Sequence, residues 1–200
     1  MKIVIMCLCI ALLSSCTSEP LNVRYYLLHT PENEVSRTSD DSKPSVVLQL
    51  INVADYLRQS SLVMQVGQHE LHYSRQDVWA EELQTSFYNA LLQELNISSQ
   101  QNYVALTAPN ASLATTSITI TLKHFHVTDV STVVASGQYW LSANNALLNK
   151  LESTPISSHA FFFELDLKQD GYAHAVEQLR ALITNLATQI EKDITALPNN

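Results

Sequence analysis

SITITLKHFHV, residues 117–127, and VVASGQYWL, residues 133–141, both alternate between apolar and other side chains. Ile118, Ile120 and Leu122 take every second position, which places them on one face of a strand. Only residues 128–132 separate the two stretches, so we expect an antiparallel hairpin. The hairpin has an apolar face that another part of the chain must cover.

Several other segments have the composition of strands, rich in β-branched and aromatic residues between turn signals. The segment 45–53 is apolar on both faces, which is typical of an interior strand. A long polar loop is expected at 30–44, bracketed by Pro31 and Pro44. The remaining predicted strands are 23–28, 103–106, a strand marked by Phe161, Phe163, Leu165 and Leu167, and a hairpin of 62–66 with 70–73 around Gly67-Gln68.

Two segments have helical periodicity instead. In the first, apolar residues recur every four positions from Trp79 to Leu95, with Asp77 as the expected N-cap and Glu81 and Glu82 near the positive end. The second helix opens at Asp170-Gly171 and ends at Pro198. Its apolar stripe is Tyr172, Val176, Leu179, Ile183, Leu186, Ile190, Ile194 and Leu197. The stripe predicts a helix that covers the sheet, and its near-heptad spacing leaves a coiled-coil seam as an alternative.

The order of elements is strand-rich, helix, strand-rich, helix. We therefore predict an α/β fold of the α+β type: a single domain with a mixed, mostly antiparallel sheet packed by two main helices. The sequence shows no internal repeat and no second domain boundary.

The first 16 residues have the layout of a lipoprotein signal. Lys2 precedes an apolar run, 3–13, that is too short to cross a bilayer core of about 20 residues. Leu13-Ser14-Ser15-Cys16 then resembles a lipobox, in which Cys16 is acylated after cleavage. We expect residues 1–15 to be the signal peptide, 16–22 the lipidated tether and 23–200 the periplasmic domain. Thr17 follows Cys16 where an aspartate would signal inner-membrane retention, which favours the periplasmic face of the outer membrane.

Composition narrows the function classes. The chain carries 11 Lys and Arg against 19 Asp and Glu, a net charge of −8, which disfavours binding to nucleic acid. Of its three cysteines, only Cys16 survives cleavage, so the mature domain has no internal disulfide and no free thiol for catalysis once Cys16 is acylated. Membrane attachment must come from the lipid.

Catalytic signals are weak, and we expect no catalytic residue, no resident metal and no cofactor. His124 and His126 share one strand face at a spacing that some metal sites use, so a metal-binding or hydrolytic lipoprotein is the alternative. Asp55, Glu70, Asp77 and Glu164 have no visible partner and are expected to be solvated or capping residues. Trp140 lies opposite Tyr139, and we expect the second helix to cover it; an exposed anchor for a partner or lipid is the alternative.

The order of these pieces resembles the PqiC/YmbA family, the auxiliary lipoproteins of ABC-type and MCE-type transport systems. The resemblance rests on the lipobox and on five later segments, in sequence order. They are Tyr25-Tyr26-Leu27-Leu28, Tyr56-Leu57-Arg58, a strand pair ending at Tyr73, Trp79-Ala80-Glu81-Glu82-Leu83, and Asp170-Gly171-Tyr172 before a long helix. The polar insertion around residues 32–43 departs from the family pattern by its length.

The resemblance implies a non-enzymatic lipoprotein tethered to the outer membrane. Its partner would be an MCE-domain protein that spans the periplasm, and its role would be intermembrane lipid transport and envelope integrity. Only Cys16, the lipid attachment site, carries over as a functional residue. A ring-shaped conduit would favour a matching ring or cap, so a homo-oligomer is expected as well. Direct carriage of a lipid between helix and sheet is a third alternative.

Overall fold

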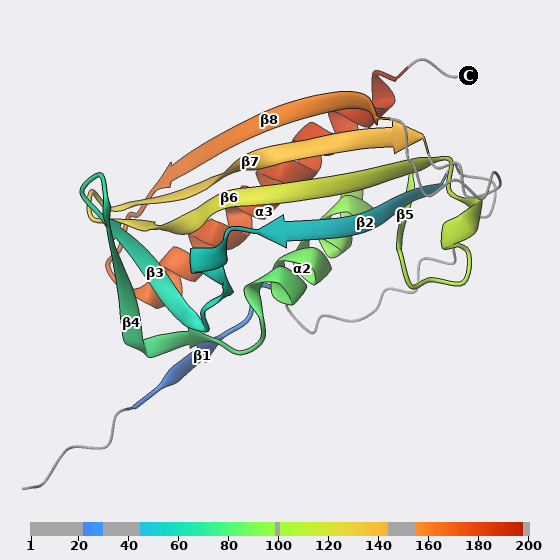
Figure 1. The fold of residues 1–200 in the computed structure, drawn as a ribbon. Coiled ribbons are helices and arrows are strands. Elements are labelled where there is room, and N and C mark those ends of the chain that lie inside the picture. The colour runs from blue at the N-terminus through green and yellow to red at the C-terminus, as the bar shows by residue number, and fades with distance from the viewer. Residues whose placement is uncertain (1–21, 30–44, 99–100, 144–154, 198–200) are drawn as a thin grey trace, which may run out of the picture.

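The computed structural model describes residues 22–29, 45–98, 101–143 and 155–197. Within these ranges, eight strands form one mixed sheet, and two long helices pack on it (Figure 1). This confirms the predicted α+β class. The strands are β1 (Arg24–Tyr26), β2 (Ser45–Val53), β3 (Ser61–Val66), β4 (Glu70–Trp79), β5 (Asn102–Ala105), β6 (Thr116–Thr128), β7 (Thr132–Ala143) and β8 (Pro155–Asp166). The helices are α2 (Leu83–Ser98) and α3 (Tyr172–Thr195), with short 3₁₀ turns at Asp55–Arg58 and Ala111–Leu113.

Strand β6 is the centre of the sheet. It pairs with β7 along one edge in the predicted antiparallel hairpin, and β7 pairs with β8 in turn. Its other edge is divided between two parallel neighbours, β2 along its first half and β3 at its end. Beyond these, β2 pairs with β5, whereas β3 pairs with β4 and β4 with β1. The predicted hairpin around Gly67 is the β3–β4 pair.

Both helices lie on the same face of the sheet (Figure 1). The predicted stripe of α3 is buried there, with Ile183 and Ile190 fully enclosed. The stripe packs in the same core as Ile118, Ile120 and Leu122 of β6. The coiled-coil alternative is therefore wrong, because the seam is already covered by the domain's own sheet.

The start of the first helix was predicted too early. Trp79 is the last residue of β4, and α2 begins at Leu83. Asp77, Val78 and Trp79 pair with β1, which takes up backbone groups that a helix would have used. Trp79 still packs in the core, with its ring 6.4 Å from that of Phe125, so its apolar position matched the helical period by coincidence.

A β-bulge divides β6 into two halves. The register shifts between Leu122 and His124, so the core side changes from even-numbered to odd-numbered positions. Phe125 and Val127 consequently face the helices. His124 and His126 lie on the face that carries no helix.

Trp140 lies on that open face as well. Its neighbour Tyr139 is fully buried among the core residues that α3 covers, whereas Trp140 is half-buried. The prediction that the second helix covers Trp140 is therefore wrong, since both helices pack on the opposite face. The loop predicted at 30–44 lies outside the described residues.

Candidate functional site

The predicted lipidation site, Cys16, lies outside the described residues. Strand β1 begins at Arg24, eight residues further along the chain. Eight extended residues span at most about 28 Å. Strand β1 is therefore the part of the described fold that an anchor at Cys16 would hold nearest to a membrane.

Asp77 fastens β1 to the sheet. Its Oδ1 lies 2.8 Å from the guanidinium of Arg24 and accepts a hydrogen bond of 2.9 Å from the Tyr26 hydroxyl. Its Oδ2 accepts a bond of 3.1 Å from the Ser74 hydroxyl. Burial raises the pKa of Tyr26, and the bond to Asp77 raises it further. The expectation that Asp77 is a helix cap or a solvated carboxylate is wrong, because the residue is only 4% exposed and its side chain holds two strands together.

The other three carboxylates that were expected to be solvated or capping residues, Asp55, Glu70 and Glu164, are exposed. Asp55 pairs only with Arg58, at 3.3 Å and one 3₁₀ turn away. Glu70 and Glu164 lie on exposed positions of β4 and β8. For these residues the expectation of solvent exposure is confirmed.

The structure brings His124 and His126 together, with ring centroids 5.6 Å apart. His126 is only 2% exposed, and both of its ring nitrogens have partners: Nδ1 lies 3.2 Å from the Tyr56 hydroxyl, and Nε2 lies 2.9 Å from the Gln65 amide oxygen. Burial, with a smaller contribution from a charge on His124, lowers the pKa of His126 to about 4.

His124 has a partner as well, the Ser136 hydroxyl 2.7 Å from its Nδ1. Within the described ranges, no three His, Cys, Asp or Glu side chains gather to hold a metal ion. Metal binding at either ring nitrogen of His126 would displace the hydrogen-bond partner on that nitrogen. This arrangement favours a structural role for the pair.

A second histidine site was missed by the sequence analysis. Nε2 of His159 lies 2.8 Å from the Ser157 hydroxyl, and its Nδ1 lies 3.1 Å from a carboxylate oxygen of Asp193. The Tyr139 hydroxyl donates to the same carboxylate, and its ring stacks on His159. Serine, histidine and aspartate occur in this order in hydrolase triads. No spacing in the sequence could have indicated it, because β8 and the end of α3 meet only in the fold.

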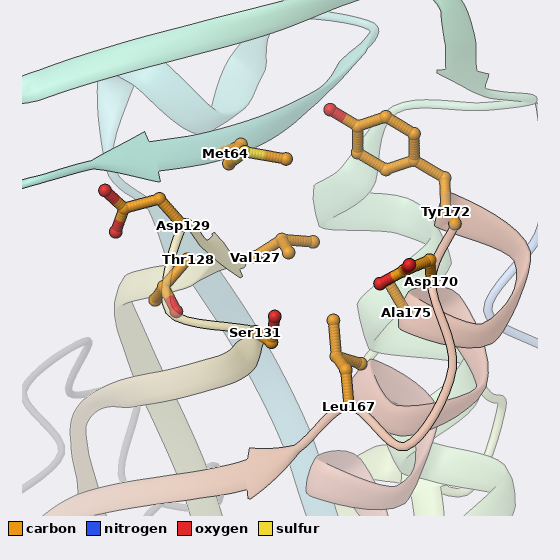
Figure 2. Close-up of a pocket in the computed structure, with 10 residues that line it drawn as sticks. Met64, Val127, Thr128, Asp129, Ser131, Leu167, Asp170, Tyr172 and Ala175 are labelled. Atoms are coloured by element: carbon orange, nitrogen blue, oxygen red, sulfur yellow. The ribbon is translucent and has the colours of Figure 1, made fainter.

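A cavity of about 250 Å³ opens beside the start of α3 (Figure 2). Met64 from β3, Val127 from β6 and Leu167 from the loop after β8 contribute apolar side chains to its lining. Tyr172 and Ala175 of α3 form another wall. Its polar lining residues are Thr128, Asp129, Ser131 and Asp170.

The cavity adjoins the Asp77 network. Burial raises the pKa of Tyr172, and the charge of Asp77 raises it further, whereas a hydrogen bond with Ser74 acts in the opposite direction. Tyr172 therefore lies between the cavity and the residues that fasten β1. This places the cavity on the part of the domain next to the predicted anchor.

Comparison with known proteins assigns the chain to a family. A family model described as "ABC-type transport auxiliary lipoprotein component" matches residues 26–191. The chain belongs to this family. The match runs from the end of β1 almost to the end of α3, and it confirms the family predicted from the order of the motifs.

Relatives agree with this assignment. The chain is 25% identical over 187 residues to the intermembrane transport lipoprotein PqiC of Escherichia coli, an alignment that covers 93% of this chain and 94% of that protein. Two solved structures share the fold. One, an uncharacterized protein, is 21% identical, covers 86% of this chain and 99% of its own, and has a TM-score of 0.69. The other, from Xanthomonas campestris, is 10% identical, covers 74% and 84%, and has a TM-score of 0.60.

The chain is thus a transport auxiliary lipoprotein. None of the helices in the described part of the chain has both the length and the apolar character needed to cross a membrane.

Proposed function

We propose that this protein is a non-enzymatic auxiliary subunit of an MCE/ABC-type intermembrane lipid transport system. It acts from the periplasmic face of the outer membrane, anchored by a lipid on Cys16, and supports envelope integrity. The observation that carries the proposal is the family match over residues 26–191, together with the relative named as an intermembrane transport lipoprotein. The lipobox before Cys16 supports the anchor.

The geometry fits a docking role. An anchor at Cys16 would keep the start of β1 within about 28 Å of the bilayer, measured along the extended tether. Confinement raises the effective concentration of the domain at the membrane, so that a modest affinity for a transport partner is enough. The Asp77 network fixes β1, the strand nearest to this anchor, on the edge of the sheet.

Two experiments test this proposal. The first is metabolic labelling with palmitate, in which the wild-type chain takes up label and a Cys16→Ala variant does not. The second is affinity purification from membranes, in which the wild-type chain retains an MCE-domain protein. A chain that carries no acyl group, or that purifies alone from cross-linked membranes, contradicts the proposal.

We also propose that the domain self-associates, because a conduit built from a ring of subunits would favour a matching ring or cap. Light scattering of the purified lipoprotein over a range of concentrations measures the mass directly. A monomer at every concentration contradicts self-association and leaves the anchoring proposal intact.

Ester hydrolysis is a second candidate function. It is favoured by one observation, the triad-like arrangement in which His159 contacts both Ser157 and Asp193. For the hydrolytic alternative, this arrangement is a better candidate site than His124 and His126. A fluorophosphonate probe forms a covalent bond with an activated serine. Labelling of the wild-type chain that is lost in Ser157→Ala would establish this alternative. An unlabelled chain supports the non-enzymatic proposal.

A further inference from the structure

The cavity in Figure 2 has a size that restricts what it can hold. Pockets for drug-sized ligands measure about 300–1,000 Å³. At about 250 Å³ the cavity lies below this range, so it is too small for a whole two-chain lipid. A single aliphatic chain segment is a better match, because Met64, Val127 and Leu167 converge on the space from three sides.

The charge of the cavity restricts the ligand's headgroup. Two carboxylates, those of Asp129 and Asp170, belong to the lining, and no lysine or arginine does. The carboxylate of Asp170 points into the space in Figure 2, whereas that of Asp129 accepts a hydrogen bond of 2.9 Å from the backbone of Gly67. Lys168 follows Leu167 but is not part of the lining.

Helix α3 opposes these carboxylates only weakly. Its first residue, Tyr172, lines the cavity, and a helix N-terminus contributes roughly half a positive charge. The full negative charge of Asp170, whose carboxylate points into the cavity, outweighs it. The sum favours a cation over an anion, which is the reverse of the usual preference at a helix N-terminus.

We propose that this cavity binds one aliphatic chain of an amine-headed amphiphile, with the ammonium group held by Asp170. The choice of a membrane amphiphile as occupant rests on the proposed lipid anchor. Tyr172 lines the cavity and hydrogen-bonds with Ser74, the Ser74 hydroxyl donates to Asp77, and Asp77 holds the strand that follows the proposed anchor. The cavity therefore lies on the part of the domain where amphiphiles of the bilayer are nearest.

The test uses the chain from residue 17 onward, which keeps every described helix and strand. A single cooperative urea transition checks that it is folded. Octylammonium and octyl sulfate then serve as probes with the same chain and opposite head charges. Binding is followed by the methyl NMR signals of Met64, Val127 and Leu167.

We expect octylammonium to bind at least tenfold more tightly than octyl sulfate. The Asp170→Asn variant should reduce this ratio to threefold or less, and Ala175→Leu should weaken both probes at least tenfold by filling the space. Ala160→Leu, an exposed site on β8, is the matched control and should change neither. Because Asp170 is exposed, its variant stays informative even if Ala175→Leu does not fold.

Three outcomes would overturn the proposal. They are no saturable shift with octylammonium, equal affinity for the two probes in the wild-type domain, and binding of N-acetyl-lysine methylamide as tight as that of octylammonium. The last outcome would assign the site to a partner's lysine. Since the experiment uses neither an acylated chain nor an MCE-domain protein, its failure would leave the proposed function untouched.

Discussion

Removing the Asp77 carboxylate should release β1 from the sheet. In the Asp77→Ala variant, the hydroxyls of Tyr26 and Ser74 both lose a charged acceptor. Hydrogen bonds to charged groups contribute about 1.5–3 kcal/mol each, and their effects do not add fully, so we expect a loss of about 3 kcal/mol. That is a large part of the roughly 5–15 kcal/mol by which domains are stable.

The Asp77→Asn variant separates charge from hydrogen bonding. Its amide oxygen can still accept from Tyr26, whereas the attraction to Arg24 is lost. The Arg24 side chain is 55% exposed, and exposed ion pairs contribute about 0–1 kcal/mol. The amide nitrogen that replaces Oδ2 cannot accept the hydrogen bond from the Ser74 hydroxyl, so we expect this variant to lose about 1–2 kcal/mol, less than Asp77→Ala.

Urea unfolding gives the free energies, and amide hydrogen exchange at residues 24–26 reports on β1 itself. Asp55→Ala is the matched control, because its exposed carboxylate pairs only with Arg58. It should stay within about 0.5 kcal/mol of the wild-type chain. If Asp77→Ala is equally mild and the β1 amides exchange at wild-type rates, the network does not fasten the strand and the reasoning fails.

Two further predictions concern the sheet and its open face. In Gly137→Ala, the new Cβ would lie 2.1 Å from the backbone oxygen of Thr121, so overpacking should cost about 3 kcal/mol or more, whereas Gly67→Ala, with open space but a φ of 60°, should cost about 1 kcal/mol. Urea titrations of both variants check this order, and equal costs would contradict it. The pKa of His126 lies near 4 when folded and 6.5 when unfolded, so its contribution to stability is complete above pH 6.5 and falls, by up to about 3 kcal/mol, as the pH drops toward 4. Unfolding at pH 7.5 and 4.5 should show a smaller loss in His126→Gln; an unchanged loss would contradict this prediction.

Periodicity in the sequence correctly predicted the helices and strands that contact the same kind of surface along their whole length. The stripe of α3 faces one apolar surface for its whole length, so the pattern and the structure agree. The bounds of β2 also agree, because an interior strand between β5 and β6 is apolar on both faces.

Long-range pairing explains the errors. Trp79 has the period of a helix, yet three residues of β1, more than 50 positions earlier, pair with this segment and keep it extended. The same pairing buries Asp77, which by itself has the signature of a helix cap. For the candidate site, the sequence indicates the anchor at Cys16, but the cavity combines side chains from β3, β6 and α3 that no local pattern connects.

The topology places β1 and β8 at opposite edges of the sheet. From β1 the path runs through β4, β3, β6 and β7 to β8, five steps of about 4.8 Å, or roughly 24 Å. Strand β8 carries Phe162, a large side chain that is 65% exposed on the face without helices. A domain held at a membrane through β1 would therefore carry Phe162 at the opposite edge of the sheet. If the proposed anchor holds the domain through β1, the β8 edge stays accessible to the proposed transport partner.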